Sequence, residues 1–301
     1  MPENTVVHLE ESCSKAFIHK RESRPAQPLH PQPLRASASL AWREILRFFR
    51  QPNRIVGSIG TPVLFWLLFG MGLKHSFSLS AAGQSGTSFL EYYFAGSLVL
   101  ILLFTSIFTS ISIIEDRREG FLQGVLVAPI PRWSIVLGKI LGGSCIALFQ
   151  GLIFLLLALT LPIEWQPLAV VQLVGLLALT SLALTSLGFF IAWRMDSTQG
   201  FHAIMNLVLM PLWLLSGGFF PIPALTESAT WTDRALHWTM RLNPLTYAVA
   251  GTRQLLGGAE PMSAAFTPDL GWCWGVTLLF AVAAFAAATW IAGQRTQGDL
   301  L

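Results

Sequence analysis

The sequence predicts an all-α membrane protein with six transmembrane helices, and three observations support this prediction. Apolar residues make up 53% of the 301 residues and charged residues only 12%, and the mean hydropathy is +0.59. Apolar runs of about 20 residues recur along the chain, and basic residues concentrate before the first of them. A soluble domain of this length needs far more charge to cover its surface, so a single large soluble core is excluded.

Six apolar runs match the length of a membrane-spanning helix. The shortest has 18 residues and extends for about 27 Å at 1.5 Å per residue, which is just enough for the hydrocarbon core. Pro62 and Pro211 lie inside two of the runs, where membrane helices tolerate proline. The six predicted spans are 56–73, 89–114, 134–161, 168–193, 201–220 and 271–292.

The chain before the first span divides into two parts. Residues 1–34 are rich in proline and lack hydrophobic periodicity, which predicts a disordered cytoplasmic tail. Residues 35–54 predict an amphipathic helix, with Trp42 on an apolar stripe and Arg43 and Arg47 on a basic stripe. An ordinary surface helix is the alternative, but adjacency to a span favours a helix in the headgroup layer. The remaining predicted parts are a six-span transmembrane domain, 55–295, and a cytoplasmic C-terminal tail, 296–301.

The distribution of basic residues predicts the orientation. Six spans place both termini on one side of the membrane. Fifteen of the 19 Lys and Arg residues fall on that side, and Lys74, Arg234, Arg241 and Arg253 fall on the other. By the positive-inside rule both termini are cytoplasmic. Basic clusters also bind nucleic acid, but beside a span this one is more simply a topology signal. We therefore expect no nucleic-acid partner and a multi-pass membrane location with both termini in the cytoplasm.

The sequence carries no motif for catalysis, nucleotide hydrolysis or metal binding. Gly138-Lys139 is followed by Ile140 and lacks the earlier glycine of a phosphate-binding loop. No His-x-x-x-His or Cys-x-x-Cys pair offers metal-ligand spacing. His202 and His237 have no carboxylate or nucleophile nearby in sequence, so each is more simply an interface residue than a catalyst. We expect no metal, no resident cofactor and no enzymatic activity.

The polar residues that the sequence places in the middle of the predicted spans are uncharged. A proton- or sodium-coupled transporter usually carries ionisable groups at mid-membrane depth, whereas these spans carry Ser, Thr, Gln and Asn. Hydrogen bonding between packed helices explains these residues more simply than substrate contact does, and both interpretations stay open. The candidate pathway-lining residues are Thr105, Thr109, Asn206, Phe219 and Phe220.

Two connections between spans are informative. The connection 115–133 begins with five charged residues, continues as a short amphipathic stretch and ends at Pro129-Ile130-Pro131. Because the chain can form a pathway but shows no energy source, a partner should supply the energy, and this connection is the best docking surface for it. A merely solvated loop is the alternative. The segment between spans five and six predicts short helices on or partly within the outer leaflet, one of them around Trp231–Met240.

Three local patterns resemble the ABC-2 type permeases, in particular the bacterial drug, lipid and polysaccharide exporters that include nodulation lipo-oligosaccharide and daunorubicin-resistance permeases. The first runs from Tyr93-Phe94-Ala95-Gly96 through the second span to 115–119 and 126–131. The second is 210–221, which reads Met-Pro-Leu-Trp-Leu-Leu-Ser-Gly-Gly-Phe-Phe-Pro. The third is Leu242-Asn243-Pro244-Leu245-Thr246-Tyr247, followed by Arg253. With the amphipathic helix, the likeness covers roughly 38–295.

The resemblance implies six spans, an N-terminal interface helix, a coupling helix in the first cytoplasmic loop and a re-entrant segment between spans five and six. It also implies a location in the bacterial inner membrane and a complex of two permeases with two copies of a separate ATP-binding-cassette ATPase, which binds ATP and magnesium in place of this chain. We expect a permease homodimer, and pairing with a different second permease is the alternative. The implied coupling residues are Glu115, Asp116, Arg117, Arg118, Glu119, Leu126, Ala128, Pro129 and Arg132, and the implied outer segment contains Asn243, Pro244 and Tyr247. The Pro-rich tail departs from the family pattern, and the outer segment lacks a cysteine pair for a disulfide-clamped lid.

The sequence therefore predicts the permease subunit of an ABC-2 exporter that moves an amphipathic drug, lipid or glycan out of the cytoplasm. A stand-alone secondary transporter or channel is the main alternative, although the missing mid-membrane charges argue against it. A membrane-embedded transferase or hydrolase requires an acid/base cluster at one interface, and none is found. A structural assembly factor would bind partners and move no substrate.

Overall fold

The computed structural model describes residues 32–72, 89–161, 165–222, 225, 230–257 and 266–294. Regular structure in these ranges is entirely helical, with no strand, which confirms the all-α prediction. The predicted tail lies outside the described residues except for 32–34, and the predicted C-terminal tail 296–301 lies wholly outside them.

Five described helices are long and apolar enough to cross a membrane, and each coincides with a predicted run. A sixth run, 201–220, coincides with α8, Thr198–Leu214, which has only 17 residues. At 1.5 Å per residue α8 extends for about 26 Å, less than the usual hydrocarbon thickness of about 30 Å, so a sixth span stays a prediction. The five helices are α3 (Pro52–Gly72), α4 (Phe89–Arg118), α6 (Arg132–Leu155, continued by the 3-10 turn η1, Leu156–Thr160), α7 (Pro167–Ala192) and α11 (Leu270–Gly293).

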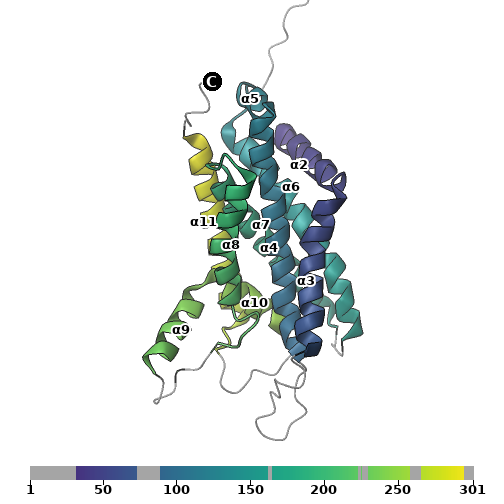
Figure 1. Ribbon diagram of the computed structural model, residues 1–301, viewed down its shortest axis with the longest axis vertical. Helices are drawn as coiled ribbons and strands as arrows, with labels where there is room; N and C mark the ends of the chain where they lie inside the picture. The colour runs from purple at the N-terminus through teal and green to yellow at the C-terminus, as the bar shows by residue number, and fades with distance from the viewer. Residues whose placement is uncertain are drawn as a thin grey trace, which may run out of the picture. The chain divides into compact units, whose positions relative to one another are not determined.

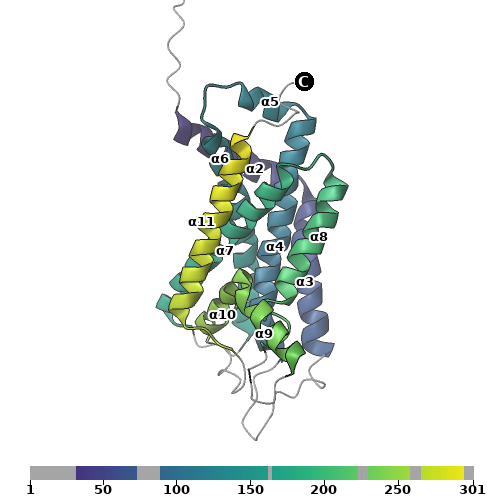
Figure 2. The same ribbon diagram turned by 90° about the vertical axis from the view of Figure 1, so that its left-hand side faces the viewer.

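Helix α4 is the most deeply buried helix of the described chain. Helices α3, α6, α7, α8 and α10 all pack against it, as the two views in Figures 1 and 2 show. Small residues on its neighbours permit this close packing. A Cβ added at Gly143 would come within 2.7 Å of the Thr185 side chain and 3.0 Å of the Thr109 hydroxyl, and one at Gly188 within 2.3 Å of the Ser110 hydroxyl. The hydroxyl-rich stretch of α4 therefore lies in contact with α6 and α7.

The amphipathic helix predicted before the first span is α2, Pro33–Phe49, and it packs against α6. Its apolar stripe is exposed, with Trp42 at 61% and Phe49 at 47% relative exposure, as expected of a helix in contact with lipid. On its inner side, the backbone of α6 at Gly138 lies so close that an added Cβ would sit 2.8 Å from that of Leu40. The helix ends before Pro52, where α3 begins, so Arg54 belongs to α3.

The segment between the fifth and sixth predicted spans forms two helices, α9 (Trp231–Leu242) and α10 (Pro244–Leu255). Thr230 and Asp233 form a capping box at the start of α9, which satisfies backbone N–H groups that the helix itself cannot pair. These helices confirm the helical stretch predicted around Trp231–Met240. The re-entrant position of the segment stays a prediction.

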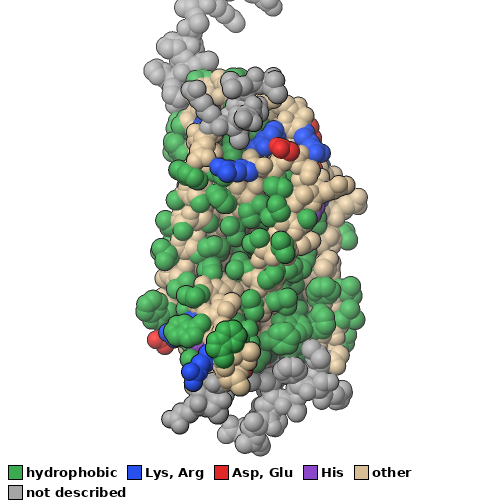
Figure 3. Space-filling model, turned by 60° about the vertical axis from the view of Figure 1, so that its left-hand side comes forward, with side chains coloured by type: hydrophobic (Ala, Val, Ile, Leu, Met, Phe, Trp, Pro, Cys, Tyr) green, Lys and Arg blue, Asp and Glu red, His purple; other side chains and the backbone are tan. Residues whose placement is uncertain are grey.

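Charge is segregated along the helix bundle. On the face shown in Figure 3, charged side chains gather toward the two ends, and apolar side chains cover the stretch between them. Buried backbone and an apolar outer surface of this kind suit a multi-pass membrane protein.

Candidate coupling site

The charged residues predicted to lie in a loop form the last turns of α4, which continues to Arg118. Arg117 and Arg118 lie in the last turn, where cations interact favourably with the helix dipole. Gly120 then adopts a left-handed conformation with φ of 75°, which glycine accepts without a steric penalty and which ends many helices. The short helix α5, Phe121–Leu126, follows. We call this end of the bundle, formed by α2, the last turns of α4, α5 and the start of α6, the α5 end.

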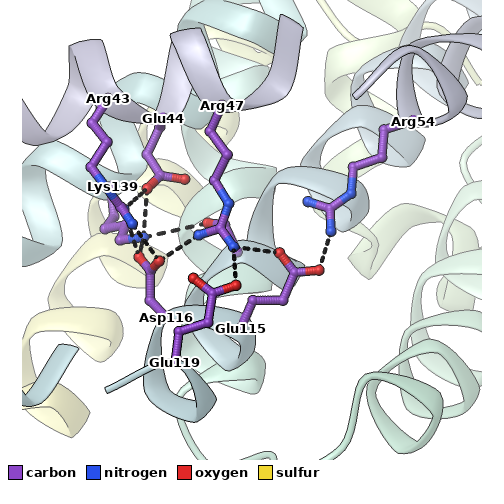
Figure 4. A network of polar contacts seen from close by, with 9 residues as sticks. Arg43, Glu44, Arg47, Arg54, Glu115, Asp116, Glu119 and Lys139 are labelled. Carbon is purple, nitrogen blue, oxygen red and sulfur yellow. Dashed lines mark hydrogen bonds and ion pairs between the residues drawn. The ribbon is translucent and has the colours of Figure 1, made fainter. Parts of the chain in front are cut away.

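Asp116 is the central group of the α5 end. Its side chain is fully buried, and it forms ion pairs with Arg43 at 2.8 Å, with Arg47 and with Lys139. The three cations come from two different helices, since Arg43 and Arg47 belong to α2 and Lys139 to α6 (Figure 4). A single buried carboxylate therefore joins α2, α4 and α6.

The other carboxylates extend this cluster outward. Glu115 pairs with Arg47 at 2.9 Å and with Arg54 at the start of α3. Glu119 pairs with Arg47 at 3.1 Å, but 59% of its side chain is exposed. On α2, Glu44 pairs with Lys139 at 2.6 Å. The four cations and four carboxylates balance, and we call them the charge network: Arg43, Glu44, Arg47, Arg54, Glu115, Asp116, Glu119 and Lys139.

Helix geometry explains why these charges meet. Arg43 and Arg47 are four residues apart on α2, so they lie on one face of that helix. Glu119 directly follows α4, and its N–H still donates to the carbonyl of Glu115 at 2.8 Å, so these two glutamates also lie on one side. Hydrogen bonds to Asp116 raise the pKa of Arg43 above the ordinary value of an arginine, so this cation stays charged. Burying charges costs several kcal/mol per ion, and close opposite charges offset that cost only while the pairs are complete.

The remaining predicted coupling cations are bound within the chain. Arg117 donates to the carbonyl of Trp193 after α7, and Arg118 donates to the carbonyl of Asp196 at 2.8 and 3.1 Å. Arg132 donates to the carbonyl of Ala292 in α11 at 2.9 Å. These three side chains therefore connect the α5 end to the chain after α7 and to the end of α11.

The surface of the α5 end that is open to a partner consists mainly of α5 and the turn after it. Val127 is 85% exposed, and Gln123, Gly124 and Pro129 are also exposed. Leu126 and Ala128 are half-buried. Of the predicted coupling residues, the structure thus exposes Arg118, Glu119 and Pro129 and turns Asp116 inward.

The predicted pathway residues do not meet at one place in the described chain. Thr105 donates to the Gln150 side chain, which also accepts from Ser58 at 2.8 Å, and all three are buried. Thr109 is buried on α4 as well and donates to the carbonyl of Ser106 at 3.1 Å. This pattern matches the packing interpretation for the two threonines.

The other pathway candidates lie elsewhere. Asn206 is exposed on α8. Phe219 packs edge-on to Tyr93 with ring centroids 5.2 Å apart, and Phe220 is 49% exposed.

The outer-segment residues have structural roles at the start of α10. Asn243 caps α10 by accepting from the Leu245 N–H at 2.9 Å, and it also donates to the carbonyl of Leu212 in α8. Pro244 occupies the first position of the helix, where its missing N–H has no cost. The ring of Tyr247 lies 6.5 Å from that of Phe266.

Sequence reasoning missed the α2 and α6 members of the network. The basic stripe that contains Arg43 and Arg47 predicts contact with lipid headgroups, and the sequence assigns no role to Lys139 beyond topology. A usable signal is present, because the four-residue spacing of the two arginines matches that of Glu115 and Glu119. Across the described ranges, no group of three His, Cys, Asp or Glu residues is placed to hold a metal ion.

Comparison with known proteins adds the decisive observation. The family model described as ABC-2 type transporter matches residues 36–256, a stretch that runs from α2 to the end of α10 and contains the whole charge network. The chain belongs to the ABC-2 type transporter family. This ABC-2 permease is therefore a multi-pass membrane transport protein rather than an enzyme, and family membership implies association with an ATPase subunit.

Individual relatives of this ABC-2 permease are consistent with its assignment to the family. Nodulation protein J of Rhizobium meliloti (strain 1021) is 25% identical over 223 residues, which cover 73% of this chain and 78% of the relative. The inner membrane transport permease YadH of Escherichia coli (strain K12) is 24% identical over 266 residues, which cover 87% of this chain and 96% of the relative.

Proposed function

We propose that this chain is the membrane-spanning subunit of an ATP-driven exporter, in which a separate ATPase binds ATP and magnesium and docks on the α5 end. The exported substrate is an amphipathic drug, lipid or glycan. Membership of the ABC-2 family supports this proposal, and so does the absence of a nucleotide-binding motif from the sequence.

The observation that carries the proposal is the position of the charge network directly beside α5. Only Glu119 and Gly120 separate the last residue of α4, Arg118, from α5. A force on α5 therefore acts on the α4 turn that carries Glu115 and Asp116. Those carboxylates bind Arg43 and Arg47 of α2 and Arg54 of α3. Closure of the ATPase subunits would thus move α2, α3 and α4 together and tilt the first, second and fifth spans.

The proposed assembly contains two ATPase subunits and two copies of this permease, with both termini in the cytoplasm of a bacterial cell. The excess of basic residues on one side supports this orientation. It places α5 on the ATP-containing side of the membrane and α9 on the other. A pathway formed between two copies also fits the location of Asn206 on an exposed face of α8.

The test is to co-express the full chain with a candidate ATP-binding-cassette ATPase subunit from the same organism and to measure co-purification and ATP turnover in vesicles. Val127→Asp places a charge on the exposed apolar side chain after α5 and should reduce both readouts at least about tenfold, the effect of losing about 1.4 kcal/mol at an interface. Val127→Thr, which has nearly the same shape without a charge, should resemble the wild type.

Two results would contradict the proposal. One is a failure of the wild-type chain to bind the ATPase or to alter its turnover. The other is substrate flux in vesicles without ATPase that follows an ion gradient, which would support a secondary transporter or channel.

A further inference from the structure

A groove of about 590 Å³ runs along α2 at the α5 end. Its lining combines two apolar side chains with three guanidinium groups and one carboxylate: Trp42, Leu46, Arg43, Arg47, Arg50 and Glu119. The volume lies within the range of sites that hold small molecules. Apolar surface beside concentrated positive charge suits a ligand that has an apolar chain and an anionic head.

The positive charge of the groove is not fully neutralised. Arg43 and Arg47 are bound to carboxylates of α4. Arg50 is exposed, and it forms no ion pair with any carboxylate of the described residues. Trp42 and Leu46 are 61% and 41% exposed along the same groove. A ligand there would find one free guanidinium, two partly engaged ones and an adjacent apolar surface.

A second, independent observation concerns Gln51, which also lines the groove. Its side-chain Oε1 is buried and has no hydrogen-bond donor among the described residues. A buried acceptor without a donor costs about 1–3 kcal/mol. A hydroxyl next to the anionic group of the ligand would supply the missing donor.

We propose that this groove binds the phosphate headgroup of an amphiphilic lipid, with Arg50 as the primary phosphate contact and Gln51 as an acceptor for a neighbouring hydroxyl. The inference rests on the proposed function for the orientation, which places α2 in the inner-leaflet headgroup layer. Basic side chains at that depth attract anionic lipid, and an aromatic side chain such as Trp42 favours the same interface. Two sources share this chemistry, a resident phospholipid and a lipid-phosphate substrate.

The groove and the charge network share three side chains, Arg43, Arg47 and Glu119. A phosphate that approaches Arg47 competes with Glu119, whose carboxylate lies 3.1 Å from it and is largely exposed. Binding in the groove therefore weakens the Arg47–Glu119 pair, the most exposed link between α2 and the chain after α4, while Asp116 keeps its pairs with α2. Because coupling between two sites is reciprocal, movement of α5 would also change the affinity of the groove.

The full chain is reconstituted in phosphatidylcholine that contains a fixed fraction of phosphatidylglycerol and is then purified. The experiment measures how much phosphatidylglycerol the purified protein retains. Phosphatidylglycerol is the probe because its headgroup has both a phosphate and hydroxyls. Arg50→Gln should lower the retained phosphatidylglycerol about fivefold, the effect expected for one basic contact. Arg35→Gln is the matched control, because Arg35 is exposed on the same helix but does not line the groove. The control should retain lipid as the wild type does.

Competition separates the two sources. A polyprenyl phosphate that displaces phosphatidylglycerol at a low mole fraction supports the site and identifies a substrate-like ligand. Displacement only at equal mole fraction supports the site and identifies a resident phospholipid. Equal losses in Arg50→Gln and Arg35→Gln, no preference for phosphatidylglycerol over phosphatidylcholine, or displacement by soluble inorganic phosphate would each overturn the inference. Lipid retention needs no ATPase, so its outcome is independent of the co-purification test of the proposed function.

Discussion

The two ends of the bundle are held together by different chemistry. At the α5 end, eight charged side chains from four helices form one balanced network. At the opposite end, where α9 and α10 lie (Figures 1 and 2), the contacts are mainly hydrogen bonds to backbone carbonyls and packed rings. We call this second region the α10 end, and it consists of the start of α4, the turn after α8, and α10.

Backbone geometry dominates the α10 end. The Tyr92 hydroxyl and the Arg253 guanidinium both donate to the carbonyl of Gly217 at 2.9 Å. The Trp213 indole donates to the carbonyl of Gly96 at 2.9 Å. A Cβ added at Gly96 would lie only 2.4 Å from the carbonyl oxygen of Gly218. The turn after α8 is therefore fixed against α4 in one arrangement.

This difference in contacts indicates at which end the helices can shift gradually and at which end they cannot. Long charged side chains can exchange partners while their helices shift, because one arginine can reach several carboxylates. Hydrogen bonds to fixed carbonyls and a contact between two backbones permit only small displacements before they break. Small shifts of the helices at the α5 end can therefore occur while the ion pairs re-form, whereas opening the α10 end requires a discrete separation of α4 from the turn after α8.

The sharpest way to break the comparison is to remove the central charge of the network. Asp116→Asn keeps the shape of the side chain but leaves Arg43, Arg47 and Lys139 with fewer carboxylates, so we expect a loss of about 3–5 kcal/mol in the free energy of unfolding. Glu119→Gln is the control, because Glu119 is exposed, and it should cost less than about 1 kcal/mol. Denaturant unfolding in detergent measures both. Equal losses in the two variants would show that the network is a surface feature.

Gly96→Ala tests the backbone contact at the α10 end. The new methyl group must displace the turn after α8, so we expect a loss of about 1–3 kcal/mol. Gly60→Ala in α3 is the control, since its Cβ would meet only Val56 at 3.9 Å, and it should be neutral or stabilising. The same unfolding measurement applies. A stable Gly96→Ala variant would show that the two backbones separate at little cost.

Tyr92→Phe tests a single neutral hydrogen bond at the same end. The carbonyl of Gly217 keeps its bond from Arg253, so we expect a loss of only about 1 kcal/mol. Because no full charge is removed, the loss should be the same at low and high salt. A loss that depends on salt would indicate that the α10 end is electrostatic after all.

The smallest expected effect is the pH dependence of the capping box at the start of α9. Hydrogen bonds from Thr230 lower the pKa of Asp233 below its ordinary value of 3.8. The folded state thus favours the ionised carboxyl, and its contribution is complete above the unfolded pKa and is lost as the pH falls through the lowered pKa. Hydrogen-exchange protection of the first turn of α9 should fall below about pH 4. Asp233→Asn removes the titrating carboxyl and should abolish that pH step, and a step that persists would assign it to another group.

Much of the fold could be predicted from the sequence, because the determinants are local. Apolar runs of membrane-spanning length marked α3, α4, α6, α7 and α11, and the pattern around Trp231–Met240 marked α9. Pro52 is the first residue of α3, and Gly120, in its left-handed conformation, separates α4 from α5. These features need no knowledge of which helices are neighbours.

The spacing of the two arginines and the two glutamates is visible in the sequence, but their pairing does not follow from it, because the members of the charge network are distant in sequence. Arg43 and Asp116 are 73 residues apart, and Arg47 and Glu115 are 68 apart. Their pairing depends on α2 packing across α6, which follows from the close approach at Gly138 and Gly142. A linear pattern shows that charges exist but not which of them are turned inward, and for that reason Asp116 was expected at a docking surface.

The most direct test of the account is the location of the ATPase contact. A photo-cross-linking amino acid is placed at Val127 in one variant of the full chain and at Trp238 in another, because Val127 is exposed at the α5 end and Trp238 is exposed on α9 at the opposite end of the bundle. In membranes that contain the ATPase, the account predicts a cross-link to the ATPase from position 127 and none from position 238. A cross-link from position 238, or none from position 127 in a complex that still co-purifies, would contradict it.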